Sequence, residues 1–216
     1  MLIVQSFINT PVNSNCYVLF DKEQSNDCII VDPGSESESH LILFLKRENL
    51  IPKYIILTHE HFDHCWGVKQ LVGEYHIPVI CSRLCAEAIK DEKRNCSVFY
   101  DNKVGFVIDC QIIDAGLIDE NIKIGEKQIV FFETPGHTEA SISFVVWHYL
   151  FTGDTLIKDI RTVTKLPTGS KDALIVSLDV FATMQGKGYR VCPGHGASFE
   201  LDHYDLNKMI EDYDRM

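Results

Sequence analysis

The stretch THEHFDHCWG (58–67) places His59, His61, Asp63 and His64 within six consecutive positions. In extended or loop backbone alternate side chains point the same way, so His59 and His61 can hold one ion from one side. Asp63 and His64 are adjacent and need a turn, after which they can face a neighbouring position. The stretch therefore has two interpretations, a metal-binding site and an ordinary polar loop.

Three further loops carry a histidine or an aspartate directly after a predicted strand. They are TPGHTEAS (134–141) with His137, LFTGDT (150–155) with Asp154, and CPGHG (192–196) with His195. Glycine and Pro-Gly permit the tight turns that bring a polar side chain to the rim of a sheet. With the first stretch they supply five imidazoles and two carboxylates, a donor set that suits two borderline metal ions, zinc above all.

The apolar pattern predicts two runs of strands, each followed by helices. The predicted strands are 2–8, 15–20, 27–32, 53–58, 78–81, 104–108, 111–113, 121–124, 127–133, 141–147, 149–152 and 189–192. The predicted helices are one from about Ser37, 66–75, 84–90, 171–184 and 203–214. This order predicts an α/β fold in which two sheets pack together with helices outside, a four-layer αββα sandwich. We expect residues 1–216 to form one such domain.

The composition and net charge argue against nucleic-acid and membrane partners. The chain has 216 residues and a formal net charge of −11, which argues against general nucleic-acid binding because phosphate binding relies on Lys and Arg. No apolar run approaches the roughly 20 residues that span a bilayer, and the first residues have no basic region typical of a signal peptide. We therefore expect a cytoplasmic protein that acts on a small molecule, with no membrane or nucleic-acid partner; its oligomeric state is open.

Eight cysteines are even in number, but without a signal peptide reduced thiols are expected rather than disulfides. Cys81 and Cys85 lack the second pair that a zinc ribbon needs. Cys65 and Cys192 stand beside candidate ligands and are expected to pack as small apolar groups.

The order and flanking letters of these motifs resemble the metallo-β-lactamase superfamily and, within it, the glyoxalase II-like hydrolases. The resemblance covers nearly the whole chain and includes NSNCYVL (13–19), IIVDPG (29–34), ILTHEHFDHCWG (56–67), ETPGHTEASISF (133–144), LFTGDTL (150–156) and VCPGHG (191–196). It implies an αββα sandwich with a metal site along one edge, which agrees with the layers predicted from the apolar pattern.

The resemblance also implies a ligand set for two metal ions, with zinc expected and iron or manganese as alternatives. The first ion would be held by His59, His61 and His137, the second by Asp63, His64 and His195, and both by Asp154.

The activity implied is hydrolysis of a thioester or ester by a metal-bridging hydroxide, which Asp63 would also help to orient as a catalytic residue. The loop PGHGAS departs from the His-Glu-Tyr typical of full-length glyoxalase II at this histidine, and the chain lacks its C-terminal helical region. We therefore expect simpler thioesters to be hydrolysed about as well as glutathione thioesters. Two alternatives stay open: a mononuclear iron oxygenase that acts on persulfides, and a metal-bound module without catalysis.

Five further residues near the motifs have candidate roles. Lys158, Arg161 and Lys165 lie between two ligands and could bind an anionic part of the substrate. Glu60 is expected to be a solvated side chain. Asp32 in VDPG is expected to cap a turn, with support of a metal ligand as the alternative.

Overall fold

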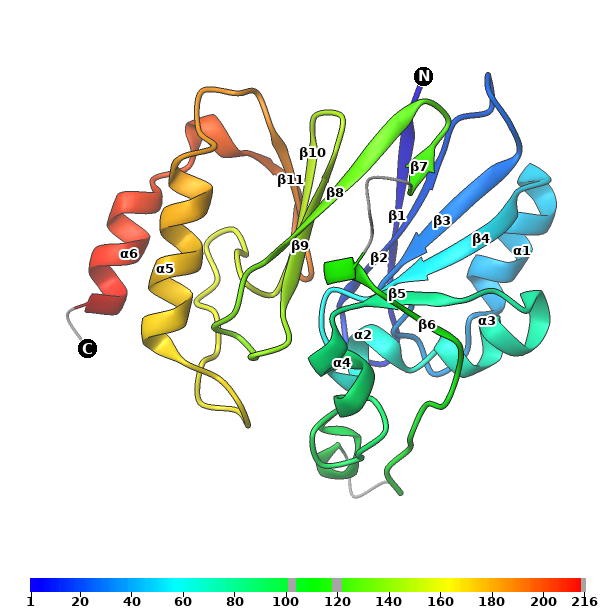
Figure 1. Ribbon diagram of the computed structural model, residues 1–216, viewed down its shortest axis with the longest axis horizontal. Coiled ribbons are helices and arrows are strands. Elements are labelled where there is room, and N and C mark those ends of the chain that lie inside the picture. The colour runs from blue at the N-terminus through cyan, green and yellow to red at the C-terminus, as the bar shows by residue number, and fades with distance from the viewer. Residues whose placement is uncertain (101–103, 118–121, 215–216) are drawn as a thin grey trace.

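Two six-stranded sheets packed face to face form the centre of the fold (Figure 1), in a computed structural model that describes residues 1–100, 104–117 and 122–214. The first sheet has the order β1-β2-β3-β4-β5-β6, formed by Ile3–Ile8, Asn15–Phe20, Asp27–Val31, Ile51–Ile56, Val79–Cys81 and Ile112–Asp114. The second has the order β12-β11-β10-β9-β8-β7, formed by Phe199–Glu200, Arg190–Pro193, Tyr149–Gly153, Ile142–Val146, Lys127–Glu133 and Lys123–Ile124.

Helices cover the outer face of each sheet. Figure 1 shows α1 (Ser39–Glu48) and α3 (Val68–Tyr75) against the first sheet, and α5 (Lys171–Ala182) and α6 (Leu206–Asp214) on the side of the second. The short helices α2 (Phe62–Cys65) and α4 (Arg83–Ala88) lie at the edge where the strands end. The predicted four-layer αββα fold is therefore confirmed. Within the described ranges no helix is long and apolar enough to cross a membrane.

Successive side chains of a strand point to opposite faces of its sheet, and the buried residues therefore form three apolar layers. Along β2, Tyr17 and Leu19 point between the two sheets, whereas Val18 and Phe20 point toward α1. From the second sheet, Phe144 and Phe151 stack at 4.5 Å and fill the space between the sheets. The third layer joins the second sheet to α5 and α6. Because each face of both sheets is covered, the strands read as nearly continuous apolar runs.

Strand direction brings the ends of four strands to one edge of the molecule. In the first sheet β4 runs parallel to β3 and β5. In the second sheet β10 and β11 are parallel, and β8 runs the same way because both β8 and β10 are antiparallel to β9. The Ile142 amide, at the start of β9, donates to the Thr58 carbonyl at 2.9 Å, so the two sheets are joined directly after β4.

The predicted strand at 104–108 is wrong: its residues form an irregular segment. The buried Asn95 side chain donates to the Phe106 carbonyl at 2.8 Å, and the Ile108 amide donates to the Ile89 carbonyl at 2.9 Å. The segment therefore satisfies its backbone against the preceding loop, not against a neighbouring strand.

Other predictions differ from the structure in their boundaries. The helix predicted at 66–75 is observed as α3 (Val68–Tyr75), while the short helix α2 before it and the two-residue strand β12 have no counterpart among the predicted elements. The strand predicted at 121–124 is observed as Lys123–Ile124, and residue 121 lies outside the described residues.

Glu38, directly before α1, is a carboxyl group buried away from the strand ends. Its side chain is 3% exposed and accepts a hydrogen bond from the Ser35 amide at 3.0 Å. It packs against Gly67 so closely that a Cβ added there would lie 2.3 Å from Glu38 Oε1. Burial raises the pKa of Glu38 to about 7, although the hydrogen bond from Ser35 opposes this shift.

We predict that Glu38→Gln reduces the pH dependence of folding stability. The pKa of Glu38 is higher in the folded state than in the unfolded chain, so the wild-type protein loses stability as pH rises from about 4.5 to 7. The expected loss relative to Glu38→Gln is up to roughly 3 kcal/mol. Urea unfolding of both proteins, metal-free and across this pH range, measures the difference. Parallel pH profiles would show that the carboxyl group is not buried in this way.

Candidate metal centre

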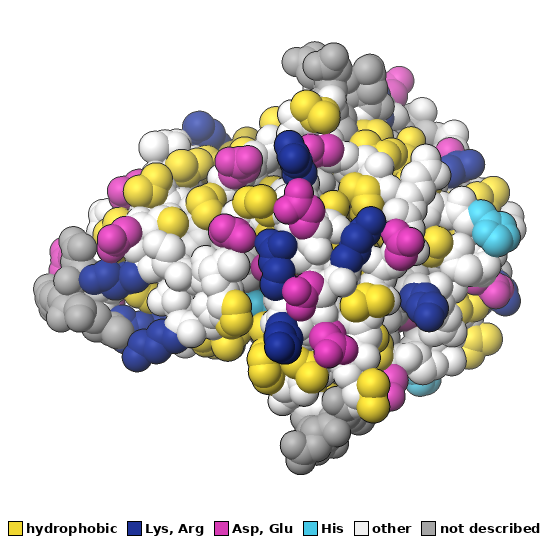
Figure 2. Space-filling model, turned by 60° about the horizontal axis from the view of Figure 1, so that its bottom comes forward, with side chains coloured by type: hydrophobic (Ala, Val, Ile, Leu, Met, Phe, Trp, Pro, Cys, Tyr) yellow, Lys and Arg dark blue, Asp and Glu magenta, His cyan; other side chains and the backbone are white. Residues whose placement is uncertain are grey.

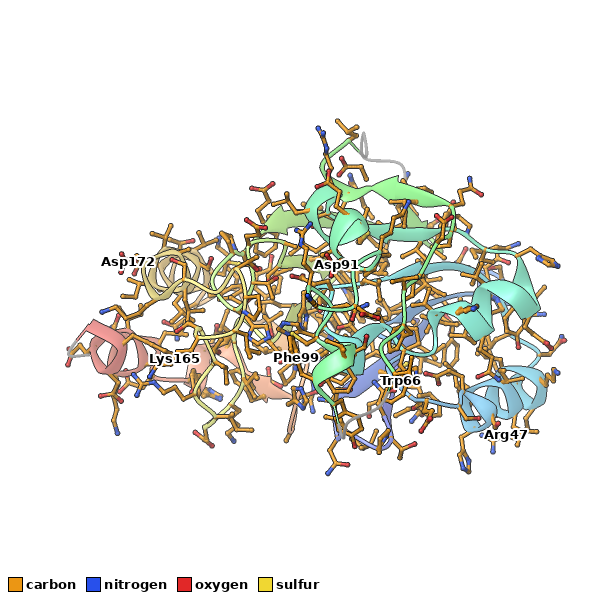
Figure 3. All side chains as sticks on the ribbon, turned by 90° about the horizontal axis from the view of Figure 1, so that it is seen from below. Arg47, Trp66, Asp91, Phe99, Lys165 and Asp172 are labelled. Carbon is orange, nitrogen blue, oxygen red and sulfur yellow. The ribbon has the colours of Figure 1, made fainter. Side chains whose placement is uncertain are left out.

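The strand ends bring the seven candidate ligands from four loops into one cluster. Those of THEHFDH follow β4, and the other three follow β8, β10 and β11; they are His59, His61, Asp63, His64, His137, Asp154 and His195. Figure 3 views this edge from below, with Trp66 and Phe99 on the side of the first sheet and Lys165 on the loop before α5. Residues up to 136 positions apart in the chain therefore meet at one site.

Among the described residues the cluster contains three groups of three ligands, and within each group the ligand atoms lie within 4.8 Å of one another. His59, His64 and Asp154 form a group that overlaps the other two, which share no residue and are called the two triads. One consists of His59, His61 and His137, and all three are buried. The other consists of Asp63, His64 and His195, of which His195 is the most exposed, with 24% of its side chain accessible. These are the two groupings that the family resemblance implied.

Asp154 lies between the two triads. Its Oδ2 is 3.6 Å from Nε2 of His137 and 3.4 Å from Nε2 of His195, and its Oδ1 is 3.5 Å from Nε2 of His64. Gly194 makes room for this carboxylate, because a Cβ added there would lie 2.1 Å from Asp154 Oδ1. One carboxylate is therefore in reach of both halves of the cluster.

Hydrogen bonds to the Nδ1 atoms of two histidines orient their rings. Nδ1 of His137 donates to the Val163 carbonyl at 2.8 Å, and Nδ1 of His195 donates to the Asn13 carbonyl at 3.0 Å. Such bonds fix the tautomer and turn Nε2 of both rings toward the cluster, where Nε2 of His137 lies 2.8 Å from Nδ1 of His61 and Nε2 of His195 lies 3.2 Å from Asp63 Oδ2.

Asp32 orients a third ring. Its Oδ2 lies 3.1 Å from Nδ1 of His64 and accepts from the Thr58 hydroxyl at 2.7 Å, and its Oδ1 accepts from the Thr58 amide at 2.8 Å. The same hydroxyl lies 3.1 Å from Nδ1 of His59. Asp32 therefore supports a candidate ligand and holds the backbone directly after β4. Its described side-chain hydrogen bonds go to Thr58 and His64, not to the VDPG turn that it was expected to cap.

Buried polar atoms without partners support binding of a metal at this centre. Nε2 of His59, His61 and His64 and Oδ1 of Asp154 are buried, and within the described part of the chain none of these atoms has a hydrogen-bond partner. Unpaired buried polar atoms are rare in native proteins and call for a missing partner. A cation shared among them would satisfy these atoms together, so the residues present fit metal ions of the kind that bind imidazole and carboxylate.

The charges of the cluster also favour a cation. Burial and the neighbouring His137 lower the pKa of His61 to about 3, so its ring is neutral. Burial opposes protonation of His195, but hydrogen bonds to Asp154 and Asp63 raise its pKa to about 11. The carboxylates thus attract positive charge, and a metal ion can supply that charge in place of a proton.

Glu60 was predicted to be solvated, and this is wrong. It is 1% exposed, and its Oε2 accepts a hydrogen bond from the Thr138 hydroxyl at 3.0 Å. That hydroxyl also lies 3.0 Å from Ser141 Oγ. Glu60 therefore points away from the metal centre and joins the loop after β4 to the loop that carries His137.

A cavity of about 240 Å³ opens onto the cluster. Its walls are His137, Asp154, His195, Ile157, Ile160, Arg161 and Val163. Ile160 and Arg161 also border a neighbouring groove of about 730 Å³, which Lys158 lines. Lys165 lines neither space. Of the three basic residues proposed to bind substrate, Arg161 therefore borders the cavity and the groove, Lys158 borders the groove, and Lys165 borders neither.

Sequence reasoning missed the residues that support the ligands from a distance, notably Thr58 and the segment around Asn13 and Asn15. The segment was noted for its place in the motif NSNCYVL, without a function. Polar residues stand at the start of β2, a strand that is buried along its whole length. Because buried polar groups need hydrogen-bond partners, this pattern could have indicated that the segment bonds to other parts of the chain.

Comparison with known proteins identifies the family. A sequence model of the metallo-beta-lactamase superfamily matches residues 9–210, so the chain belongs to this superfamily. The hydroxyacylglutathione hydrolase of Buchnera aphidicola subsp. Baizongia pistaciae is 32% identical over 176 residues, which cover 74% of this chain and 61% of that protein. The chain is thus similar to only part of that hydrolase.

Two solved structures of similar length share the fold. The crystal structure of BLEG-1 B3 metallo-beta-lactamase has a TM-score of 0.80 at 27% identity and covers 92% of this chain and 94% of that chain. The crystal structure of TTHA1623 in a di-iron-bound form has a TM-score of 0.75 at 27% identity and covers 92% and 95%. A similar chain therefore holds two metal ions, and in that case they are iron.

We predict that Gly194→Ala weakens metal binding, because the new methyl group would displace the Asp154 carboxylate and the His64 ring, whose Cε1 lies 2.8 Å away. We expect a loss of Zn²⁺ affinity of about 10- to 100-fold, measured by competition with a chromogenic chelator. Gly73→Ala is the matched control, since nothing lies within 4 Å of its added Cβ. Unchanged affinity in Gly194→Ala would contradict the packing described.

Proposed function

We propose that the chain is a dinuclear metal-dependent hydrolase of thioesters or esters. The observation that carries the proposal is the position of Asp154, whose carboxylate lies within 3.6 Å of imidazoles from both triads. A purely structural zinc site is closed by four ligands, whereas seven ligands around two neighbouring positions suit a catalytic pair.

His59, His61 and His137 would hold one ion, Asp63, His64 and His195 the other, and Asp154 would contact both. Zinc is the expected metal, and iron is the main alternative because the similar TTHA1623 is known in a di-iron-bound form. When bound, such ions activate a water molecule as a nucleophile and polarise the carbonyl of the substrate.

Asp63 is proposed to have a second role in the reaction. Its Oδ2 lies 3.2 Å from Nε2 of His195 and 3.7 Å from Nε2 of His64, and 9% of the residue is exposed. A carboxylate in this position can accept a proton from the attacking water and hold its lone pair toward the substrate.

No cysteine is needed as a nucleophile. Cys192 is the thiol nearest in sequence to His195, but burial raises its pKa to about 12, so it stays protonated. All eight cysteines are free thiols, and none joins the triads among the residues that the structure describes. These observations support attack by water without a covalent enzyme intermediate.

The substrate is proposed to be a small molecule with an apolar acyl group. Ile157, Ile160 and Val163 line the cavity and would exclude water from the acyl side. Arg161 is the cavity's basic residue and could bind an anionic substituent. Figure 2 shows Lys and Arg interspersed with Asp and Glu over the face that it presents, which favours a small substrate over a nucleic acid.

Hydrolysis by the zinc-loaded protein tests the proposal. We predict turnover of S-acyl thioesters that is lost on chelation, and a fall in kcat/KM of more than about 100-fold in Asp154→Ala, beyond the range for residues that only support ligands. Asp179→Ala, on the exposed side of α5, is the matched control and should keep full activity.

The metal content of the same samples separates the alternatives. Two ions with thioesterase activity support the proposal. A single iron with oxygen consumption on a persulfide would identify an oxygenase instead, and two bound ions without hydrolysis of any thioester or ester would leave the non-catalytic module.

A second prediction concerns the basic residues. Arg161 borders both the cavity and the adjoining groove, and on the side of the groove its guanidinium lies over Tyr213 at 4.7 Å and donates to the Asp212 carbonyl at 3.1 Å. We expect Arg161→Gln to raise KM about tenfold for a thioester whose thiol part carries a carboxylate, with little change in kcat. A substrate without the carboxylate should show no such effect.

Lys165→Gln is the matched control for charge, because Lys165 lines neither the cavity nor the adjoining groove. An equal rise in KM in both variants would mean that overall charge, not a contact by Arg161, governs binding.

A further inference from the structure

We propose that residues 9–15, which connect β1 to β2, are a clamp that positions the second triad and leaves the first unaffected. We call this segment the N-terminal clamp. The inference rests on the proposed function in that it assigns the second triad to its own metal ion. The clamp residues act through the ligands, so they are positioning residues.

One side of the clamp holds the backbone of Asp63. The Ser14 hydroxyl donates to the Asp63 carbonyl at 2.5 Å, and Asn9 Nδ2 donates to Ser14 Oγ at 2.8 Å and to the Asp32 carbonyl at 3.0 Å. Gly34 packs against the same carbonyl so closely that a Cβ there would lie 1.5 Å from the oxygen. The position of Asp63 is therefore fixed from two sides.

The other side of the clamp holds the loop that carries His195. Asn15 Nδ2 donates to the carbonyls of Pro193 and Gly196, at 2.9 and 2.8 Å, and the Asn15 amide donates to the Gly194 carbonyl at 2.6 Å. The Asn13 carbonyl accepts from Nδ1 of His195 itself at 3.0 Å. The clamp thus bonds to the backbone before and after the ligand and to the ligand ring.

Burial shows that these polar side chains belong to the protein interior. Asn9, Ser14 and Asn15 are 1%, 0% and 2% exposed, and none lines the cavity at the metal centre. Buried amides and hydroxyls are costly unless they are hydrogen-bonded. Here their described partners include backbone atoms of the two segments that carry Asp63 and His195, which links segments about 50 and 180 residues away in sequence.

The first triad is held by contacts outside the clamp: Thr58 Oγ1 lies 3.1 Å from Nδ1 of His59, and Nδ1 of His61 lies 2.8 Å from Nε2 of His137. His137 donates to the Val163 carbonyl, and the Ser177 hydroxyl on α5 donates to the Pro135 carbonyl at 2.6 Å. None of the hydrogen bonds described for the side chains of the clamp goes to the loop that carries His137. Loosening the clamp should therefore free His195 and Asp63 while His59, His61 and His137 stay in place.

Cobalt titration of the metal-free protein tests this selectivity. We expect wild type to bind two Co²⁺ ions in steps seen by visible absorption. In Ser14→Ala and Asn15→Asp the first step should be unchanged and the second weakened by at least about tenfold. Asn15→Asp preserves the side-chain volume but replaces the donor by a carboxylate oxygen that repels the Pro193 and Gly196 carbonyls, whereas Ser14→Ala removes a donor without adding charge. Ser177→Ala removes a similar hydroxyl–carbonyl bond beside the first triad and should leave the second step unchanged.

Hydrogen exchange of the metal-free protein gives a second measurement that needs no metal and no activity. Peptides covering 60–66 should exchange faster in Ser14→Ala, and peptides covering 192–197 should exchange faster in Asn15→Asp, whereas peptides covering 134–141 should not change in either variant. Equal weakening of both Co²⁺ steps, no weakening of either, or an equal change of exchange in the peptides covering 134–141 would overturn the clamp. Fewer than two Co²⁺ ions in wild type would instead overturn the proposed function, and the exchange result would still decide the clamp.

Discussion

The structure depends on the cost of gathering five imidazoles and two carboxylates at one buried edge. Ring nitrogens of His59 and His64 and an oxygen of Asp154 are removed from water and have no hydrogen-bond partner. Buried polar atoms of this kind destabilise the folded state unless they form hydrogen bonds or bind a metal ion. A cation resolves the conflict, because the neutral imidazoles bind it and the carboxylates balance its charge. The fold is thus best understood as a scaffold for metal ions that the ligand atoms require.

Strand direction explains how a chain of this length brings the ligands together. The first sheet supplies four candidate ligands from one loop after β4, and the second supplies three from separate loops after β8, β10 and β11. The apolar layers hold the sheets at a fixed spacing, and Asp154 lies where the two contributions meet. A rigid frame with loops then separates two tasks: the strand ends bring the candidate ligands together, and the loop with Ile160 and Arg161 lines the cavity in which the proposed substrate would bind.

The apolar pattern and the family resemblance made the fold predictable, and short offsets along the chain identified candidate ligands, whereas contacts between distant segments stayed hidden. His59, His61, Asp63 and His64 could be assigned because their offsets are short and the family resemblance places them. Glu60 could not, because its partner Thr138 is 78 positions away and only the folded chain shows the carboxylate buried. The irregular segment at 104–108 failed for a similar reason, since a side chain from Asn95 satisfies its backbone. The clamp was missed because asparagine and serine before a strand are also common in ordinary turns.

The central claim is that two metal ions share Asp154. Crystals of the zinc-reconstituted protein, with anomalous difference maps recorded on both sides of the zinc absorption edge, test it most directly. We expect two zinc peaks, one contacted by His59, His61 and His137, the other by Asp63, His64 and His195, with Asp154 contacting both. A single peak, or two peaks with Asp154 bound to only one of them, would contradict it.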